Sequence, residues 1–153
     1  MRRTGQPIAL YGGVSAVEPM EADTPTEEHW PVSVKGVLSW NGRAVVLRND
    51  RGEWELPGGR LEASDDSPQD ALRREIGEEL GVDAEIGSLV DSWIYDVEGK
   101  RVLILTYACE ATQPEVLSHS DEHTDVGLLT AAEFSDAPIP SGYLRSLERA
   151  LGD

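Results

Sequence analysis

The chain has 153 residues, which fits one domain of ordinary size. Its 29 acidic and 13 basic side chains give a net charge of −16, which argues against a broad basic surface for a nucleic-acid duplex or an anionic membrane. No uncharged apolar run approaches the ~18 residues of a membrane span, and the single cysteine, Cys109, cannot form an internal disulfide. We therefore expect a globular protein that binds neither a nucleic-acid duplex nor a membrane.

The amino-terminal part differs from the rest in composition. Residues 1–31 are expected to form an extension that ends in an acidic, proline-containing linker, and residues 32–153 to form one domain. Arg2 and Arg3, followed by apolar residues 8–17, loosely resemble a secretion signal, but two glycines interrupt the apolar run and no A-x-A-like site follows it. We therefore expect a cytoplasmic protein.

The first regular elements are predicted after this extension. Residues 32–40 alternate between apolar and polar side chains as a strand does, and residues 44–47 continue as its partner. Asn41-Gly42 between them is a strong two-residue hairpin pattern. Later elements are two strands at 86–95 and 101–109 around a turn at 98–100, a short helix opened by a capping box at Thr130 and Glu133, and a carboxy-terminal helix with Leu144, Leu147 and Leu151 on one face.

The best-marked helix is predicted within residues 67–82. Ser67 suits the N-cap, Pro68 the first helical position, and Gly81 the left-handed position after the last turn. Apolar side chains recur every four residues at Leu72, Ile76 and Leu80. The order of strands, one helix, strands and then helices predicts an α+β or mixed α/β sandwich.

Three glutamates lie beside the apolar stripe of this helix. Glu75, Glu78 and Glu79 fall within an arc of roughly 100° around the helix axis. One interpretation is a solvated acidic face, and the other is a site for a hard divalent cation, which prefers several converging carboxylate oxygens. The spacing alone does not decide between them.

The flanking residues resemble the Nudix hydrolase box. The resemblance rests on Leu56-Pro57-Gly58-Gly59, on Asp66, and on the run from Arg74 through Glu75, Ile76, Glu78, Glu79 and Gly81 to Val82. Two departures are present: six residues instead of five separate Gly59 from Asp66, and this acid is an aspartate where the family has glutamate. By the resemblance, Asp66 is expected to pair with Arg74 and steady the loop.

The resemblance implies an α/β/α sandwich with a mixed β-sheet and an enzyme that cleaves pyrophosphate bonds with Mg²⁺ or Mn²⁺. The implied substrate is a nucleoside diphosphate linked to another moiety, such as an ADP-ribose-like compound, a nucleotide-sugar or a nucleoside triphosphate. Glu78 and Glu79 are the implied metal ligands, Glu75 a further ligand or the base, and the Gly58 carbonyl a member of the metal shell. Arg74 is implied to orient carboxylates.

A further acid is expected from the segment 118–125. By the resemblance, Glu122 is a candidate metal ligand or base, and a solvated loop is the alternative. His119 and His123 stand four residues apart, which also raises a zinc site. A hard, oxygen-rich site does not call for imidazole, so zinc is the weaker alternative.

Candidate substrate contacts are less specific. Arg48 at the end of the second strand is the first choice for a phosphate contact, followed by Arg51 and Arg60, while a plain surface position is the alternative. Trp54 or Trp93 is a candidate for stacking on a base, with a core or rim position as the alternative.

Two points remain open at the level of the whole chain. The main alternative function is a catalytically silent Nudix-fold domain that binds or regulates, which would be expected to lack one of the four charged box residues that are all present here. The amino-terminal segment is expected to cover the pocket, exchange in a homodimer or have no role.

Overall fold

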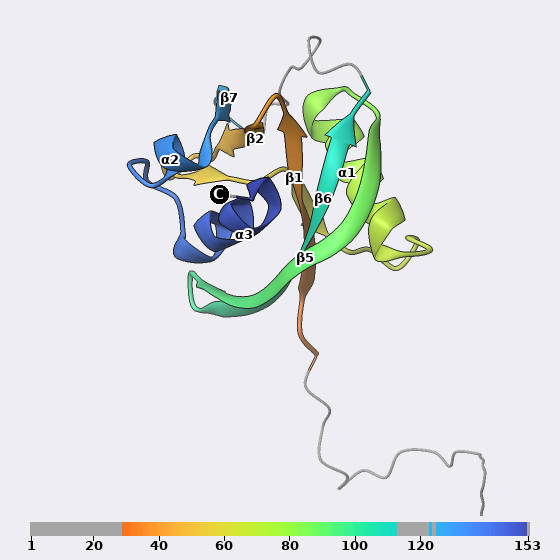
Figure 1. The fold of residues 1–153 in the computed structure, drawn as a ribbon. Coiled ribbons are helices and arrows are strands. Elements are labelled where there is room, and N and C mark those ends of the chain that lie inside the picture. Colours follow the sequence, from red (N-terminus) through yellow and green to blue (C-terminus); the bar gives the residue numbers. More distant parts are fainter. Residues whose placement is uncertain (1–28, 113–122, 124, 153) are drawn as a thin grey trace, which may run out of the picture.

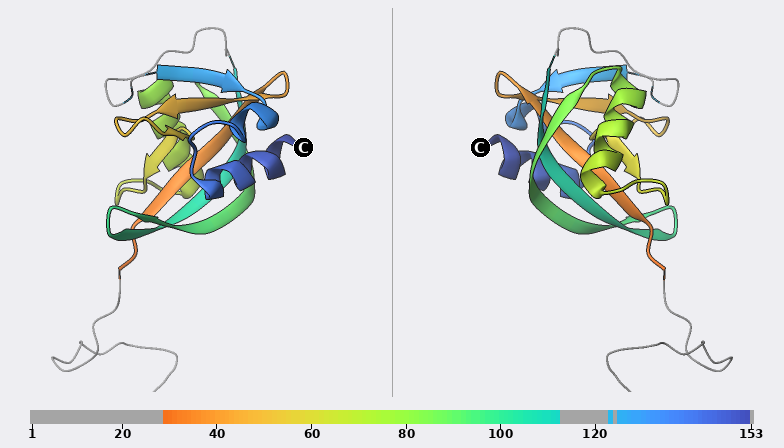
Figure 2. Two further views of the ribbon diagram at one scale, coloured as in Figure 1. Left: turned by 90° about the vertical axis from the view of Figure 1, so that its left-hand side faces the viewer. Right: turned by 90° about the vertical axis from the view of Figure 1, so that its right-hand side faces the viewer.

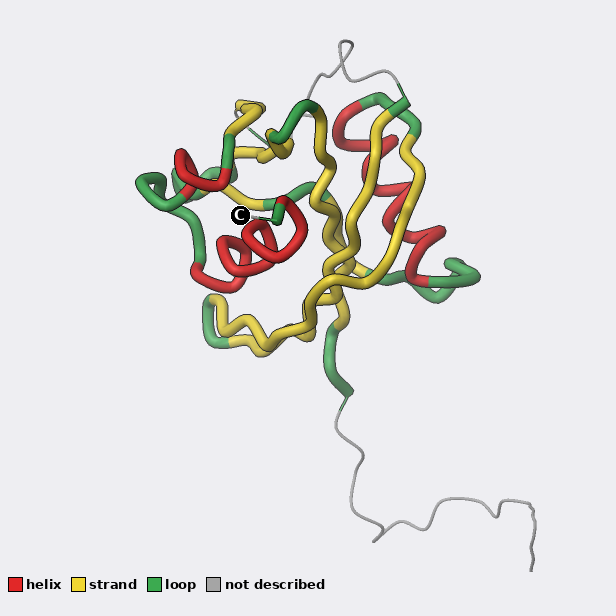
Figure 3. Tube along the Cα trace, in the orientation of Figure 1, coloured by secondary structure: helices red, strands yellow, loops and turns green. Residues whose placement is uncertain are grey.

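The computed structural model describes residues 29–112, 123 and 125–152. They form one mixed β-sheet with helices on both of its sides (Figures 1 and 3). The elements are β1 (Val32–Trp40), β2 (Arg43–Arg48), β3 (Trp54–Glu55), β4 (Gly58–Arg60), α1 (Pro68–Leu80), β5 (Ala84–Val97), β6 (Lys100–Ala111), β7 (Asp125–Leu129), α2 (Ala131–Phe134) and α3 (Ser141–Leu151). None of the helices in these described ranges is long and apolar enough to cross a membrane.

Strand β1 is the centre of the sheet, whose main order is β3-β2-β1-β6-β5. It pairs in parallel with β6 from Val32 to Ser39. Its other edge is divided, because β4 pairs antiparallel with its first half and β2 with its last two residues. The sheet therefore opens between β2 and β4, at the point where the chain crosses toward α1.

Local sequence signals account for the turns and caps. Asn41 and Gly42 both have positive φ, which joins β1 to β2 by the predicted two-residue hairpin. Ser67 accepts a hydrogen bond from the Asp70 amide at the start of α1, and Gly81 ends that helix in the left-handed conformation. The capping box at Thr130 is also confirmed.

The two faces of the sheet carry separate cores. The side views in Figure 2 show the helices that cover these faces. Helix α1 packs on one face against alternate residues of β1 such as Val34 and Leu38. Helices α2 and α3 pack on the other face, where Val37, Phe134 and Leu147 are buried. The predicted mixed α/β sandwich is confirmed.

Helix α3 is also held to β5 by a buried charge. The carboxylate of Asp91, a side chain only 1% exposed, accepts hydrogen bonds from Ser146, Arg145 and Arg149 at 2.8, 3.0 and 2.6 Å. These contacts hold the pKa of Asp91 below its usual range against the opposite effect of burial, which is the largest single influence on it. The position of α3 is thus fixed by ionic contacts as well as by apolar packing.

Some strands differ from the predicted ranges. Strands β2, β5 and β6 each extend past their predicted ends, by one or two residues at each terminus. The patterns do not predict β3, β4 and β7, because these strands have two to five residues and no room for a clear alternation. The boundary at residue 31 stays a prediction, since residues 1–28 lie outside the described ranges.

Candidate active site

The segment that leads into β4 approaches β1 unusually closely. Gly58 pairs with Lys35 in the antiparallel ladder and has a φ of 136°, a conformation that side chains rarely adopt. A Cβ atom at this position would overlap the carbonyl oxygen of Val34. The glycine is therefore required where the chain turns from the sheet toward α1.

Helix α1 presents its carboxylates to this glycine segment. The side chains of Leu72, Ile76 and Leu80 face the core, and those of Glu75 and Glu79 face β4. A Cβ atom on Gly59 would lie 2.6 Å from the carboxylate of Glu75, so the second glycine leaves the space that this side chain occupies. The glycines and the glutamates are thus parts of one arrangement.

Glu79 is the most buried member of the group, with only 5% of the residue exposed. Its Oε1 accepts a hydrogen bond of 2.8 Å from the Gly58 amide. Burial raises the pKa of Glu79 to about 7, and the neighbouring Lys35 ammonium only partly opposes this effect. A solvated acidic face therefore does not describe this residue.

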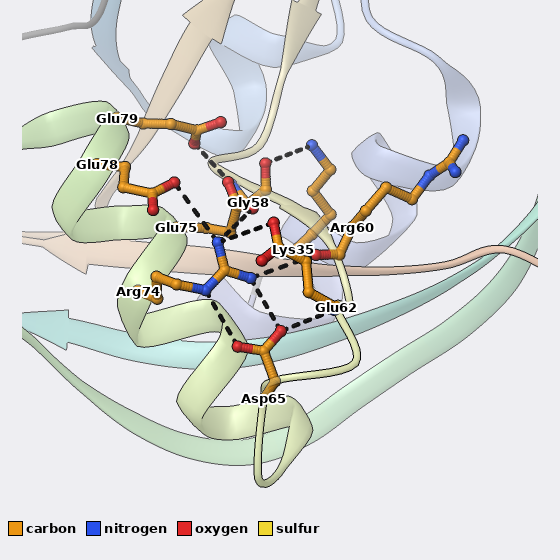
Figure 4. Close-up of polar contacts among 9 residues, drawn as sticks. All are labelled: Lys35, Gly58, Arg60, Glu62, Asp65, Arg74, Glu75, Glu78 and Glu79. Atoms are coloured by element: carbon orange, nitrogen blue, oxygen red, sulfur yellow. Dashed lines mark hydrogen bonds and ion pairs between the residues drawn. The ribbon is translucent and has the colours of Figure 1, made fainter.

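Glu75 and Glu78 are both in contact with the Arg74 guanidinium (Figure 4). The Arg74 Nη1 atom lies 3.1 Å from Glu75 Oε2 and 3.5 Å from Glu78 Oε1. Partial burial raises the pKa of Glu75, whereas the Glu78 side chain is 60% exposed. These contacts are those of an arginine that orients carboxylates.

The acid that pairs with Arg74 is Asp65 and not Asp66, which corrects the expectation from the box. Asp65 Oδ1 accepts from Arg74 Nε at 3.0 Å and Asp65 Oδ2 from Nη2 at 2.9 Å, a two-point contact (Figure 4). The bonds to Arg74 hold the pKa of the Asp65 carboxyl below its usual range. Five residues separate Gly59 from Asp65, so the first spacing of the box is kept and the additional residue follows the acid.

This pairing leads to a testable difference between two adjacent aspartates. Asp65→Ala should lower kcat by about tenfold, because Arg74 loses its two-point partner and no longer holds Glu75 and Glu78 in place. Asp66→Ala, the matched control, should leave kcat within about twofold. Steady-state kinetics of both variants check this, and an equal loss in both would contradict the assignment of Asp65.

Lys35 is a functional candidate that the sequence analysis does not select. Its ammonium is buried in the opening between β2 and β4 and donates to the carbonyls of Leu56 at 3.1 Å and Gly58 at 3.3 Å. Burial, the largest single influence, lowers its pKa, but Tyr143 and the carboxylates of Glu55, Glu79 and Glu75 together raise it above the usual value. A lysine within the apolar run of residues 32–38 is the sequence feature that could have revealed it.

His123 is the one residue of the segment 118–125 ahead of β7 that the structure describes, and it is bound to a carboxylate. Its Nε2 lies 2.9 Å from Glu55 Oε2, and this bond raises the pKa of His123. The same contact, together with Lys35 and Asn49, lowers the pKa of Glu55 to about 2 although burial opposes it. Glu122 and His119 lie outside the described residues, so their predicted roles are untested.

The predicted substrate-contacting residues lie in two places. The Arg48 guanidinium lies over the Trp54 ring, 4.9 Å from its centroid, and Trp54 also packs into the core on the α3 face. Trp93 lies in that same core. Arg60 lies instead at the box, where its carbonyl accepts from Arg74 at 3.5 Å. The contacts of the two tryptophans are those of packing residues, and the role of Arg48 stays a prediction.

The donor atoms are of the kind that a hard cation prefers, namely carboxylate and carbonyl oxygens. Within the described ranges no three His, Cys, Asp or Glu side chains are close enough to hold an ion. Arg74 is in contact with Glu75 and Glu78 in this arrangement. The Glu79 carboxylate is buried, and Lys35 only partly compensates its negative charge. A bound cation would compensate the rest. The residues fit Mg²⁺ or Mn²⁺ in kind, provided that the carboxylates turn from Arg74 toward the ion.

Sheet, helices and box together define an α/β/α sandwich with a carboxylate-bearing helix behind a glycine turn. Residues 29–149 match the family model for the NUDIX domain. A MutT-like protein of Streptomyces ambofaciens is 36% identical over 137 residues, which cover 88% of this chain and 85% of the relative. CTP pyrophosphohydrolase of Escherichia coli (strain K12) is 45% identical over 74 residues, which cover 45% of this chain and 54% of that protein.

The fold is also found in solved structures. The crystal structure of a MutT protein from Methanosarcina mazei Go1 has a TM-score of 0.71 at 20% identity and covers 82% of this chain and 95% of that one. The chain belongs to the Nudix family. Within it, the chain is a Nudix pyrophosphohydrolase, an enzyme that acts on acid anhydrides.

Proposed function

We propose that this chain uses Mg²⁺ or Mn²⁺ to hydrolyse the pyrophosphate bond of a nucleoside diphosphate linked to a further group, with nucleoside triphosphates as the first class to test. The observation that carries the proposal is the buried Glu79 carboxylate, hydrogen-bonded to the Gly58 amide and surrounded by further oxygen donors. A chain of net charge −16 needs a counterion before it can accept a pyrophosphate. The name of the Escherichia coli relative supports a triphosphate.

Some of the site residues would hold the cation, and others orient the residues that hold it. Glu78, Glu79 and the Gly58 carbonyl would hold the cation, which would neutralise phosphate charge and make a bound water more acidic. Glu75 would be a further ligand or would accept the proton of the attacking water. Asp65 fixes Arg74, which in turn orients the neighbouring carboxylates.

Substrate contacts complete the proposal. Arg60 lies beside the box at the end of β4 and is exposed, so it is placed to meet a phosphate. Arg48 is the second candidate for such a contact. Glu122 is proposed as a further ligand or base, and a homodimer and a cytoplasmic location also stay predictions.

Metal dependence is the direct test of this proposal. Hydrolysis of a nucleotide panel, followed by release of phosphate or pyrophosphate, should stop with chelator and return with Mg²⁺ or Mn²⁺. The cation competes with the proton of Glu79, whose pKa is raised to about 7, so the affinity for Mg²⁺ should increase from pH 6 to pH 8.

Three outcomes would contradict the proposal. Full activity in metal-free buffer would rule out the role of the carboxylates. Binding of nucleotide and metal without any turnover across the panel would favour the alternative of a catalytically silent binding domain. Restoration by zinc alone would instead direct attention to His119 and His123.

A further inference from the structure

A hollow of about 220 Å³ lies beside the box, on the face of the sheet that α3 covers. Pockets for drug-sized ligands measure about 300 Å³ or more, so this one suits a single ring system and not a whole nucleotide. Its lining includes Ser33, Lys35, Glu55, Arg60, Tyr95 and Tyr143. Because Glu55, Arg60 and Lys35 also border the box segment, a group bound here would be continuous with a pyrophosphate at Gly58.

The floor of the hollow carries polar groups that can form further hydrogen bonds. An ammonium has three N–H groups, and Lys35 directs two of them to the carbonyls of Leu56 and Gly58. The hydroxyls of Ser33 and Tyr143 form no hydrogen bond with the residues that the structure describes, although both residues are over nine-tenths buried. Neither hydroxyl is among the fully enclosed polar atoms of the described residues, so both are open to the hollow. With Lys35 they can therefore bind a ligand or water there.

The chemistry of the floor limits what this ligand is. Of the charged side chains that line the hollow, Arg51, Arg60, Glu98 and Lys100 are exposed, and Lys35 and Glu55 are the ones on its floor. Glu55 bonds to His123 and Asn49, and its carboxylate offsets the charge of Lys35, so a phosphate on the floor would gain little attraction. Lys35 can only donate, which favours an uncharged group with an acceptor oxygen. The rings of Tyr95 and Tyr143, 5.7 Å apart and steeply inclined to each other, form apolar walls for a flat ligand.

We propose that the hollow binds the base of the nucleotide and that Lys35 donates a hydrogen bond to a carbonyl oxygen on it. The chain then favours a base with a keto group over the matching base with an amino group, because an amino group offers Lys35 only donors. This inference rests on the proposed function, since it takes the ligand to be a nucleotide. Lys35 thereby becomes a specificity-determining residue.

Two pairs of nucleoside monophosphates test the preference, and neither requires turnover. Inosine and adenosine monophosphate differ in a keto-to-amino exchange and in the proton of the adjacent ring nitrogen, as do uridine and cytidine monophosphate. Calorimetric titration should give about tenfold tighter binding of the keto member in at least one pair. In Lys35→Met the difference within that pair should fall to about twofold or less.

A second variant separates ligand binding from support of the loop, because Lys35→Met also removes two bonds to the box segment. Tyr143→Phe keeps the ring and leaves those bonds intact, and it should weaken nucleotide binding about threefold or more. Tyr107→Phe is the control, since Tyr107 is also a buried tyrosine but belongs to the core on the α1 face. It should leave binding unchanged.

The outcomes distinguish this inference from the proposed function. Equal affinity within both pairs, or a preference that survives in Lys35→Met, would overturn the role of Lys35. Unchanged binding in Tyr143→Phe would overturn the hollow as the base site. A keto preference without hydrolysis of any nucleotide would instead leave the hollow in place and contradict the hydrolase proposal.

Discussion

Glu79→Gln should lower kcat in the presence of Mg²⁺ by about a hundredfold to a thousandfold. The amide keeps the shape of the side chain and can still accept the hydrogen bond from the Gly58 amide, so the fold is expected to persist. It removes the charge that the cation needs, at the most buried of the three box glutamates. Turnover on the best substrate and the melting temperature with and without Mg²⁺ measure the two effects.

Without metal, the effect of Glu79→Gln on stability should depend on pH. Burial raises the pKa of Glu79 to about 7 from an unfolded value near 4.5, so the folded state binds the proton more tightly. Stability from this group is therefore present at low pH and declines as pH rises through the window between the two values. Glu79→Gln should raise the metal-free melting temperature at pH 8 more than at pH 5.

Glu85→Gln on the exposed side of β5 is the control and should change neither quantity by a comparable amount. A Glu79→Gln variant with wild-type turnover and wild-type stabilisation by Mg²⁺ would remove Glu79 from the site. Loss of turnover with a collapsed melting temperature would show a structural role instead.

Gly58→Ala should destabilise the protein by about 3 kcal/mol or more. Its φ of 136° is unfavourable for alanine, and the new methyl group would overlap the Val34 carbonyl in the centre of the sheet. Neither β1 nor the box segment can move away, because β6 fixes β1 along its length and Lys35 holds the segment. Urea unfolding gives the free energy directly.

Gly77→Ala provides a control of opposite sign. Gly77 lies on the exposed side of α1, where a methyl group meets nothing closer than 4.0 Å. Alanine should therefore stabilise the helix by about 0.5–1 kcal/mol. A tolerated Gly58→Ala would show that the box segment has more freedom than its contacts indicate.

The helix and the turns were predictable because their causes are local. Ser67 and Gly81 form hydrogen bonds with the end turns of α1, and Pro68 lacks the N–H group that would be unpaired at the first helical position. The two ends of α1 are therefore determined by nearby residues. Asn41-Gly42 acts in the same way for the hairpin. The short strands β3, β4 and β7 depend on distant partners, and no pattern within two to five residues specifies those.

The candidate site was predictable to a similar, partial extent. Spacing located Glu75, Glu78 and Glu79, but only the folded chain shows that Glu79 is buried and Glu78 exposed. Lys35 is absent from the predicted set, because its role depends on an opening in the sheet that no local pattern reveals. Lys35 and Gly58, which are in contact across this opening, lie more than 20 positions apart in the sequence.

The loop between β4 and α1 has two fixed ends and one required contact between them. The Leu61 amide bonds to the Val32 carbonyl at one end, and Ser67 caps the helix at the other. Between these points the fold requires an acid that reaches Arg74, and Asp65 does so despite an additional residue behind it. Chains whose loops differ in length by one residue can therefore carry the same site, and a search that demands fixed intervals would overlook some of them.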